Sequence, residues 1–260
     1  MTFMNANCLP IIALALAAIA GPIGAARAAD PAPAAKPVIV LVHGAFADGS
    51  GWQHVIPLLE KDGYTVIAVQ NPLSSLDTDV ATTARVIDAQ KGPVVVVGHS
   101  YGGAVITGAA AGKSNVKALV YLAAFAPDSN ETVGKFADQV PVAKTLVPDS
   151  AGFLYIDRAK FHAAFCADVP VGEASIMAAV QKPLSSVVFG QSVPVAAWKT
   201  IPSWYLVSQE DHAISPELER FYAKRMGAHT SEIKASHVAF ISHPKEIVQL
   251  IEEAATAPVK

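Results

Sequence analysis

The chain has 260 residues, of which 52% are hydrophobic and 16% charged, so it can bury a sizeable core. At this length, a single folded domain is the first expectation. The formal net charge is -3, and the sequence contains no basic patch or run of like charges, which argues against nucleic acids and polyanions as partners. We therefore expect the partner to be a small molecule.

Residues 1–28 have the pattern of a secretory signal peptide. The apolar residues 11–20 are followed by a Gly-Pro break and then by an Ala-Arg-Ala cleavage site at residues 26–28. Because no Lys or Arg precedes the apolar stretch, a membrane anchor is the alternative, although residues 9–26 are marginal in length for about 30 Å of hydrocarbon. The sequence predicts a periplasmic or secreted protein without stable membrane association after cleavage.

Residues 29–36 are rich in proline and alanine and predict a linker to the first strand. After cleavage the chain would keep a single cysteine, Cys166, which cannot form an intramolecular disulfide. No C-x-x-C pattern or paired histidine indicates a catalytic role for this thiol.

From residue 38 onwards, strand and helix patterns alternate along the chain. Uninterrupted apolar runs predict strands at residues 38–42, 65–69, 94–97, 118–122 and 204–208, with a short strand near 232–234. Helices are expected at residues 52–61, 77–90 (with Asp77 as N-cap), 101–111, 216–226 and 244–255. Strands without alternation are buried on both faces, so residues 37–260 predict a doubly wound α/β domain with a mostly parallel sheet.

Residues 128–197 interrupt this alternation and predict a helical lid over the carboxyl edge of the sheet. They contain only short helical patterns, at residues 158–165 and 173–181, mixed with Pro, Gly and aromatic residues. Aromatic rings usually fill cores, so we expect packing roles ahead of substrate contacts for Phe153, Tyr155, Phe161, Phe165, Phe189 and Trp198.

The pentapeptide Gly98-His99-Ser100-Tyr101-Gly102 has the form G-x-S-x-G between a predicted strand and a predicted helix. This context is typical of a nucleophile elbow, a sharp turn that projects the serine hydroxyl above the sheet. An oxyanion needs preorganised N–H donors, and we expect them to be the backbone N–H groups of Tyr101 and Ala45. Ala45 lies in a His-Gly-Ala-Phe loop directly after the first strand, where Gly44 is expected to let the loop turn.

A serine nucleophile also needs a base and a carboxylate that orients the base. In sites of this kind both follow the serine in the chain. Asp211 is the predicted acid, because it lies in a loop between a predicted strand and helix; Glu210 beside it and Asp128 after the preceding strand are the alternatives. His237 is the predicted base, because it lies in the loop between the last strand and the last helix.

The remaining histidines have other interpretations. His43 and His99 are expected to support the oxyanion loop and the elbow, and His54 and His162 to lie on the surface or in the lid. His212 is expected to be only a neighbour of the acid, while His229 and His243 lie outside the loop that contains His237.

Taken together, these segments resemble the plant methylesterase and hydroxynitrile-lyase branch of the α/β-hydrolases, with its bacterial esterase relatives. The resemblance covers residues 37–255 and includes the elbow, the His-Gly-Ala loop, residues 122–128 and the Ala-Ser-His segment at 235–237. Lyases of this branch carry a lysine after the catalytic histidine and a threonine after the oxyanion-loop histidine. Here Val238 and Gly44 occupy those positions, which favours ester hydrolysis.

The predicted function is hydrolysis of small carboxylic esters by a Ser100, Asp211 and His237 triad through an acyl-enzyme intermediate. Neither a metal nor an organic cofactor is expected, because no metal-ligand spacing and no phosphate-loop lysine occurs. A C–C lyase, a perhydrolase or a ligand-binding homologue that keeps the pocket are the alternatives. The sequence does not specify an oligomeric state.

Overall fold

A six-stranded parallel sheet forms the centre of the protein in the computed structural model, which describes residues 35–258. The strand order is β2-β1-β3-β4-β8-β9, and every neighbouring pair is parallel. The strands are β1 (Val38–Val42), β2 (Val66–Val69), β3 (Val94–His99), β4 (Val116–Leu122), β8 (Ser203–Ser208) and β9 (His229–Ile233).

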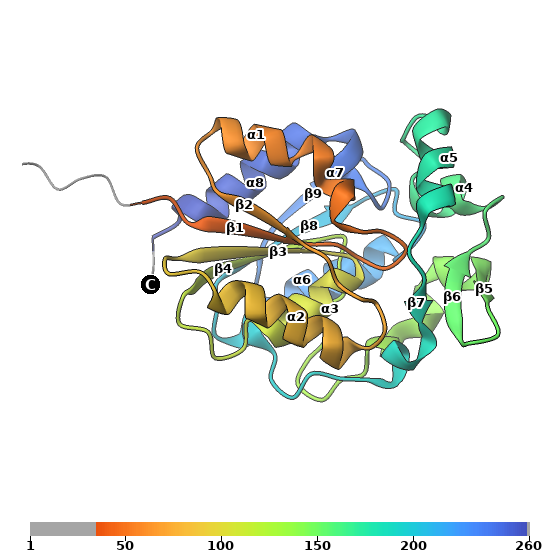
Figure 1. The fold of residues 1–260 in the computed structure, drawn as a ribbon, viewed down its shortest axis with the longest axis horizontal. Helices are drawn as coiled ribbons and strands as arrows, with labels where there is room; N and C mark the ends of the chain where they lie inside the picture. The colour runs from red at the N-terminus through yellow and green to blue at the C-terminus, as the bar shows by residue number, and fades with distance from the viewer. Residues whose placement is uncertain (1–34, 259–260) are drawn as a thin grey trace, which may run out of the picture. The chain divides into compact units, whose positions relative to one another are not determined.

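Helices cover both faces of this sheet, with α1, α7 and α8 on one side and α2, α3 and α6 on the other (Figure 1). Because both faces are covered, the strands at the centre are apolar throughout, and Val94 to Val97 of β3 are fully buried. The helices around the sheet are α1 (Ile56–Lys61), α2 (Leu76–Asp88), α3 (Tyr101–Ala109), α6 (Pro216–Met226), α7 (Ala239–Ser242) and α8 (Pro244–Thr256).

The doubly wound α/β fold predicted from the sequence is therefore confirmed, and most predicted elements agree with it to within a few residues. Three details differ. Ser75, and not Asp77, is the N-cap of α2, because its hydroxyl accepts a hydrogen bond from the Thr78 N–H at 3.1 Å. The helix expected at 52–61 consists of a 3-10 helix (Gly49–His54) followed by α1, and β9 begins three residues earlier than expected.

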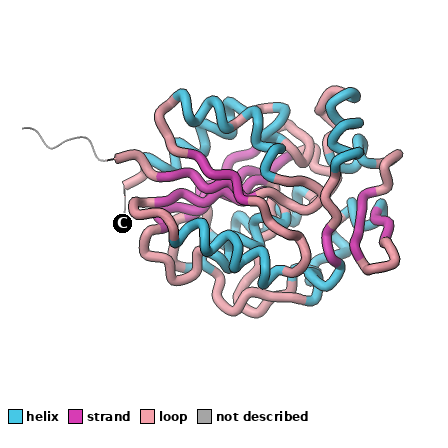
Figure 2. Tube along the Cα trace, viewed as in Figure 1, coloured by secondary structure: helices cyan, strands magenta, loops and turns pink. Residues whose placement is uncertain are grey.

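Residues 128–197, here called the insertion, lie between β4 and β8 and contain strands as well as helices. A separate antiparallel sheet, seen apart from the main sheet in Figure 2, has the order β5-β6-β7. The elements are β5 (Leu146–Pro148), β6 (Phe153–Ile156), α4 (Phe161–Phe165), α5 (Val171–Val180), β7 (Leu184–Ser185) and the 3-10 helices Val133–Gln139, Pro141–Thr145 and Ser186–Gly190, and a further 3-10 helix, Ala197–Lys199, begins at the end of the insertion. These strands of two to four residues are too short to produce a sequence pattern.

The predicted signal peptide and most of the predicted linker lie outside the described residues. Between residues 35 and 258, no helix has the length and apolar character needed to cross a membrane.

Candidate active site

Four loops that contain the predicted site residues meet at one edge of the main sheet. They follow β1, β3, β8 and β9 and contain Ala45, Ser100, Asp211 and His237, respectively. Parallel strands place their carboxyl ends at the same edge, so segments far apart in the sequence come together there.

Ser100 has the strained backbone expected of a nucleophile elbow. It lies between β3 and α3 with φ 53° and ψ -125°, a conformation that costs a non-glycine residue free energy. The first turn of α3 packs directly against the end of β1, since a Cβ on Gly102 would come within 2.5 Å of the Val42 carbonyl oxygen. A side chain at Gly102 would therefore push the elbow away from the sheet.

The two predicted oxyanion donors border the same space as Ser100. Tyr101 is the first residue of α3, so its N–H has no acceptor within the helix. Ala45 lies in the loop after β1 and lines the same pocket, and both residues are buried. Gly44 is needed for space: a Cβ there would lie 2.7 Å from Ser100 Cβ, and Phe46, with φ 61°, takes the left-handed conformation of the turn.

Asp211 and His237 form a direct hydrogen bond. The distance from His237 Nδ1 to Asp211 Oδ2 is 2.5 Å, and both side chains are almost completely buried. The other carboxylate oxygen of Asp211 accepts the Ala213 and Ile214 N–H groups at 2.5 and 2.9 Å, which fixes its orientation. The alternative acids point elsewhere, because Glu210 forms an ion pair with Lys234 and Asp128 with Lys199.

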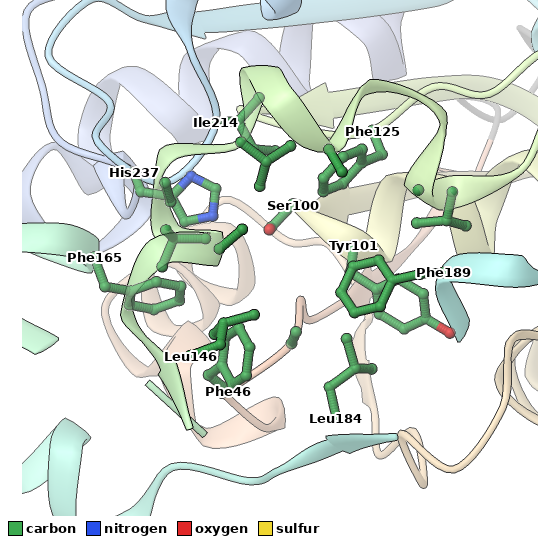
Figure 3. A pocket seen from close by; sticks show the side chains of 18 residues that line it. Phe46, Ser100, Tyr101, Phe125, Leu146, Phe165, Leu184, Phe189, Ile214 and His237 are labelled. Carbon is green, nitrogen blue, oxygen red and sulfur yellow. The ribbon is translucent and has the colours of Figure 1, made fainter. Parts of the chain in front are cut away.

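The second nitrogen of His237 is available to the serine. Within the described residues, Nε2 of His237 is buried and makes no hydrogen bond. Figure 3 shows the Ser100 hydroxyl directed toward the His237 ring, and both residues line the same pocket. The structure thus brings together the three residues predicted to form the triad.

His99 and His43 are buried, uncharged histidines whose hydrogen bonds hold the loops that contain His237 and Ala45. His99 Nε2 donates to the His237 carbonyl oxygen at 2.9 Å, and burial lowers the pKa of His99 well below its ordinary value. His43 Nδ1 donates to the Gly44 carbonyl at 2.8 Å, and its Nε2 accepts the Asn71 N–H at 3.0 Å. Burial lowers the pKa of His43 to about 4, so this ring fixes the oxyanion loop without carrying a charge at neutral pH.

Two buried carboxyl groups that sequence reasoning missed lie next to the site. Asp79 accepts the Tyr101 hydroxyl at 2.8 Å and the Leu73 N–H at 2.9 Å, which turns the Tyr101 ring away from Ser100. Glu219 accepts the Ser208 N–H at 2.9 Å. Burial and the nearby Asp211 carboxylate raise the pKa of Glu219 well above its usual range.

An apolar pocket opens in front of Ser100 (Figure 3). Its empty space, including the part open to solvent, is about 610 Å³. More than half of its lining residues come from the insertion, and no Asp, Glu, Lys or Arg is among the described residues that line it. The lining consists of Ala45, Phe46, Ser100, Tyr101, Phe125, Val133, Gly134, Ala137, Val140, Val142, Ala143, Leu146, Phe165, Leu184, Phe189, Ala213, Ile214 and His237.

Of the aromatic residues of the insertion named above, Phe165 and Phe189 line this pocket, and Phe165 also packs against Phe161. Phe46 and Phe125, from loops after β1 and β4, line it as well and had no distinguishing sequence signal. Cys166 is buried, and burial raises the pKa of its thiol to about 12, so it is not a thiolate at neutral pH. No cluster of three or more His, Cys, Asp or Glu side chains suited to a metal occurs in the part of the chain that the structure describes.

The fold and the geometry of the site agree with comparisons to known proteins. The model of the alpha/beta hydrolase family matches residues 39–250. The chain belongs to the alpha/beta hydrolase family.

Relatives of this chain include proteins named as hydrolases and esterases. "Alpha/beta hydrolase nvfD" from Aspergillus novofumigatus is 26% identical over 247 residues, which cover 85% of this chain and 97% of the relative. Methylesterase 8 from Arabidopsis thaliana is 26% identical over 211 residues, which cover 72% of this chain and 76% of the relative. The crystal structure of a pyrethroid hydrolase from Sphingobium faniae is similar with a TM-score of 0.74 at 25% identity, covering 85% of this chain and 98% of that protein. The predicted resemblance to plant methylesterases and hydroxynitrile lyases and to bacterial esterases is therefore confirmed.

Proposed function

We propose that this protein is a serine hydrolase that cleaves small, neutral carboxylic esters through an acyl-enzyme intermediate. One observation carries the proposal: the buried hydrogen bond between Asp211 and His237 lies beside a strained serine that faces an apolar pocket. The esterase names of several relatives support the same class of reaction.

In the first half of the reaction, Ser100 Oγ attacks the ester carbonyl carbon as His237 Nε2 removes its proton. Asp211 keeps the Nδ1–H tautomer and stabilises the imidazolium that forms. The N–H groups of Ala45 and Tyr101 donate to the oxyanion of the tetrahedral intermediate. When the intermediate collapses, the carbon–oxygen bond to the alcohol breaks, and the imidazolium returns its proton to the leaving alkoxide.

In the second half, a water molecule replaces the alcohol. His237 removes a proton from the water, whose oxygen attacks the acyl carbon bound to Ser100. Collapse of the second tetrahedral intermediate releases the carboxylic acid, and the proton returns to Ser100. No step requires electrons or a group from another molecule, so the residues of this chain and water suffice.

The lining of the pocket defines the substrate class. A charged substituent would lose its hydration here without gaining an ion-pair partner, because the described lining contains no Asp, Glu, Lys or Arg. The Tyr101 hydroxyl is already bonded to Asp79 and is not free to bind substrate. We therefore infer that both the acyl and the alcohol groups of the ester are uncharged.

A matched pair of esters tests the proposal. We expect the purified protein to hydrolyse p-nitrophenyl butyrate, and to hydrolyse the p-nitrophenyl monoester of succinate at least about 100-fold more slowly in kcat/KM, because the second substrate carries a carboxylate. Ser100→Ala serves as the control for background hydrolysis, and activity is measured with and without EDTA.

Three results would contradict the proposal. Loss of ester hydrolysis in EDTA would indicate a metal-dependent reaction. Cleavage of mandelonitrile without ester hydrolysis would assign the same site to a lyase. Equal rates on both esters would leave a serine esterase but remove the inference that the substrate is uncharged.

A further inference from the structure

The loop that contains His237 begins at the edge of the main sheet. It follows β9, which is the last strand and has a neighbour on one side only, β8. On the core side, the loop is held by His99, which donates to the His237 carbonyl, and by the Glu210 N–H, which donates to the Ala235 carbonyl at 3.1 Å. On the other side, β9 has no neighbouring strand in the sheet.

A carboxylate from the insertion also binds this loop. Asp168 lies between α4 and α5, and its Oδ2 accepts the Ser236 N–H at 3.0 Å and the Ser242 hydroxyl at 2.8 Å. Its Oδ1 accepts the Ser236 hydroxyl. Ser236 directly precedes His237, so one carboxylate binds both the backbone and the side chain of the residue next to the imidazole.

The same part of the insertion also contacts the Asp211 loop and the His237 ring. Ala163, in α4, accepts the His212 Nδ1–H at 3.0 Å, and His212 directly follows Asp211. The Phe165 ring lies edge-on to the His237 ring, with 5.1 Å between the ring centroids. Residues 163–168 therefore touch both of the loops whose side chains form the Asp211 to His237 hydrogen bond.

We propose that Asp168 is a positioning residue: its hydrogen bonds to Ser236 and Ser242 hold the His237 loop so that the imidazole meets both Asp211 and Ser100. This inference rests on the proposed hydrolase function. It also means that the insertion, besides bounding the pocket, helps to assemble the general base. Bonds to a charged acceptor are stronger than neutral ones, which suits a loop with only one strand beside it.

The carboxylate is charged under the conditions of the reaction. Desolvation raises the pKa of Asp168, but the hydrogen bonds from Ser236 and Ser242 outweigh it and hold the pKa below its ordinary value. Asp168 does not line the pocket in front of Ser100, so it makes no contact with a bound ester. Its loss is expected to affect kcat and to leave KM almost unchanged.

The direct test is steady-state kinetics of Asp168→Ala and Asp168→Asn on p-nitrophenyl butyrate. We expect kcat to fall by about 10- to 100-fold with KM changed by less than about threefold, because a small displacement of a catalytic group has effects of this size. Asp157→Ala is the matched control: Asp157 is also in the insertion, but it caps a local turn through the Ala159 N–H at 2.9 Å. This control is expected to keep the wild-type kcat.

A double-mutant cycle separates positioning from general stability. Ser236→Ala alone is expected to lower kcat several-fold. In the double variant with Asp168→Ala, the fall in kcat should be clearly smaller than the product of the two single effects, because both substitutions remove the hydrogen bond between the Ser236 hydroxyl and Asp168. Ser236→Ala and Ser242→Ala also test the inference if the Asp168 variants do not fold. Circular dichroism establishes that each variant compared is folded.

A folded Asp168→Ala variant with more than half of the wild-type kcat would overturn the inference and leave the proposed function intact. If the effects of Asp168→Ala and Ser236→Ala on kcat simply multiply in the double variant, or if the Asp168 variants change KM alone, the inference is overturned as well. If the wild-type protein neither hydrolyses esters nor reacts with a fluorophosphonate, the proposed function itself is wrong and the inference fails with it.

Discussion

The main sheet and the insertion contribute different kinds of residue to the candidate active site. The side chains proposed to carry out the reaction, Ser100, Asp211 and His237, follow strands of the main sheet. Most of the residues that bound the pocket come from the insertion between β4 and β8. Asp211 and His237 are held by buried hydrogen bonds and Ser100 by the turn between β3 and α3, whereas the insertion contributes apolar side chains that line the pocket.

Under the proposed function, this difference predicts that the main sheet determines reactivity and the insertion determines selectivity. Changes in the loops of the main sheet are expected to alter the rate for every ester. Changes in the insertion are expected to alter which ester is preferred, with Asp168 as the proposed exception. Substitutions of Ser100, Asp211 and Phe189 test this division, and a substitution of His43 tests the stability of the main-sheet loops.

The largest effect is expected for Ser100→Ala. Removing the hydroxyl eliminates the nucleophile, so kcat should fall by about 10⁴- to 10⁶-fold for large and small esters alike. The measurement is kcat on an ester series, with unfolding by urea to establish that the fold is kept. Retention of more than a tenth of the activity would remove Ser100 from the reaction.

Asp211→Asn is expected to have the next largest effect. The amide keeps the shape of the side chain but favours the wrong tautomer of His237, so kcat should fall by about 10³- to 10⁴-fold. Glu210→Gln is the control, because Glu210 is its exposed neighbour and pairs with Lys234; its effect should stay below about tenfold. The reverse ranking would assign the acid to Glu210.

The buried histidines of the main sheet predict a loss of stability in acid. In the unfolded chain His43 gains a proton as the pH falls below 6.5, whereas in the folded protein it stays neutral until about pH 4. The unfolded state thus binds more protons in this range, and the free energy of unfolding should decrease as the pH falls. Between pH 6.5 and 4.5 the His43 contribution is about 2 kcal/mol. Urea unfolding of wild type and His43→Gln at both pH values measures it, and equal pH dependence in the two proteins would contradict it.

The smallest expected effect is a change in preference caused by the insertion. Phe189→Ala enlarges the pocket, so the ratio of kcat/KM for a bulky ester, such as p-nitrophenyl benzoate, to that for the acetate should rise by about tenfold. Val187→Ala is the control, because Val187 belongs to the same 3-10 helix but is exposed. An equal loss of kcat on both esters would place Phe189 among the residues that determine reactivity.

The main sheet could be predicted from the sequence because its strands are continuous apolar runs between helical patterns. The two α-helices of the insertion had a sequence pattern, but its small sheet did not, since β5, β6 and β7 have only two to four residues each and pair with one another. The N-cap of α2 was misplaced for a related reason: Ser75 and Asp77 are both good capping residues, and only the backbone geometry distinguishes them.

Within the candidate site, the residues that lie in a recognisable sequence motif or directly after a predicted strand could be predicted, and the others could not. Ser100 has the elbow, and Asp211 and His237 have their places after strands. Asp79, Asp168 and Glu219 lie next to the site through contacts with Tyr101, Ser236 and Asp211, and no local pattern marks a carboxylate whose partner is distant in the chain. The places of Phe46 and Phe125 in the pocket lining could not be predicted for a similar reason, because they depend on how the strands are arranged in the sheet.

The central claim is that Ser100 is an activated nucleophile, and covalent labelling tests it most directly. After incubation with a fluorophosphonate, intact-protein mass spectrometry should show one adduct on the wild-type protein, and peptide mapping should place it on Ser100. The Ser100→Ala variant should remain unlabelled, and His237→Ala should react far more slowly. An adduct on another residue, or ester hydrolysis by a protein that the fluorophosphonate neither labels nor inhibits, would contradict the account.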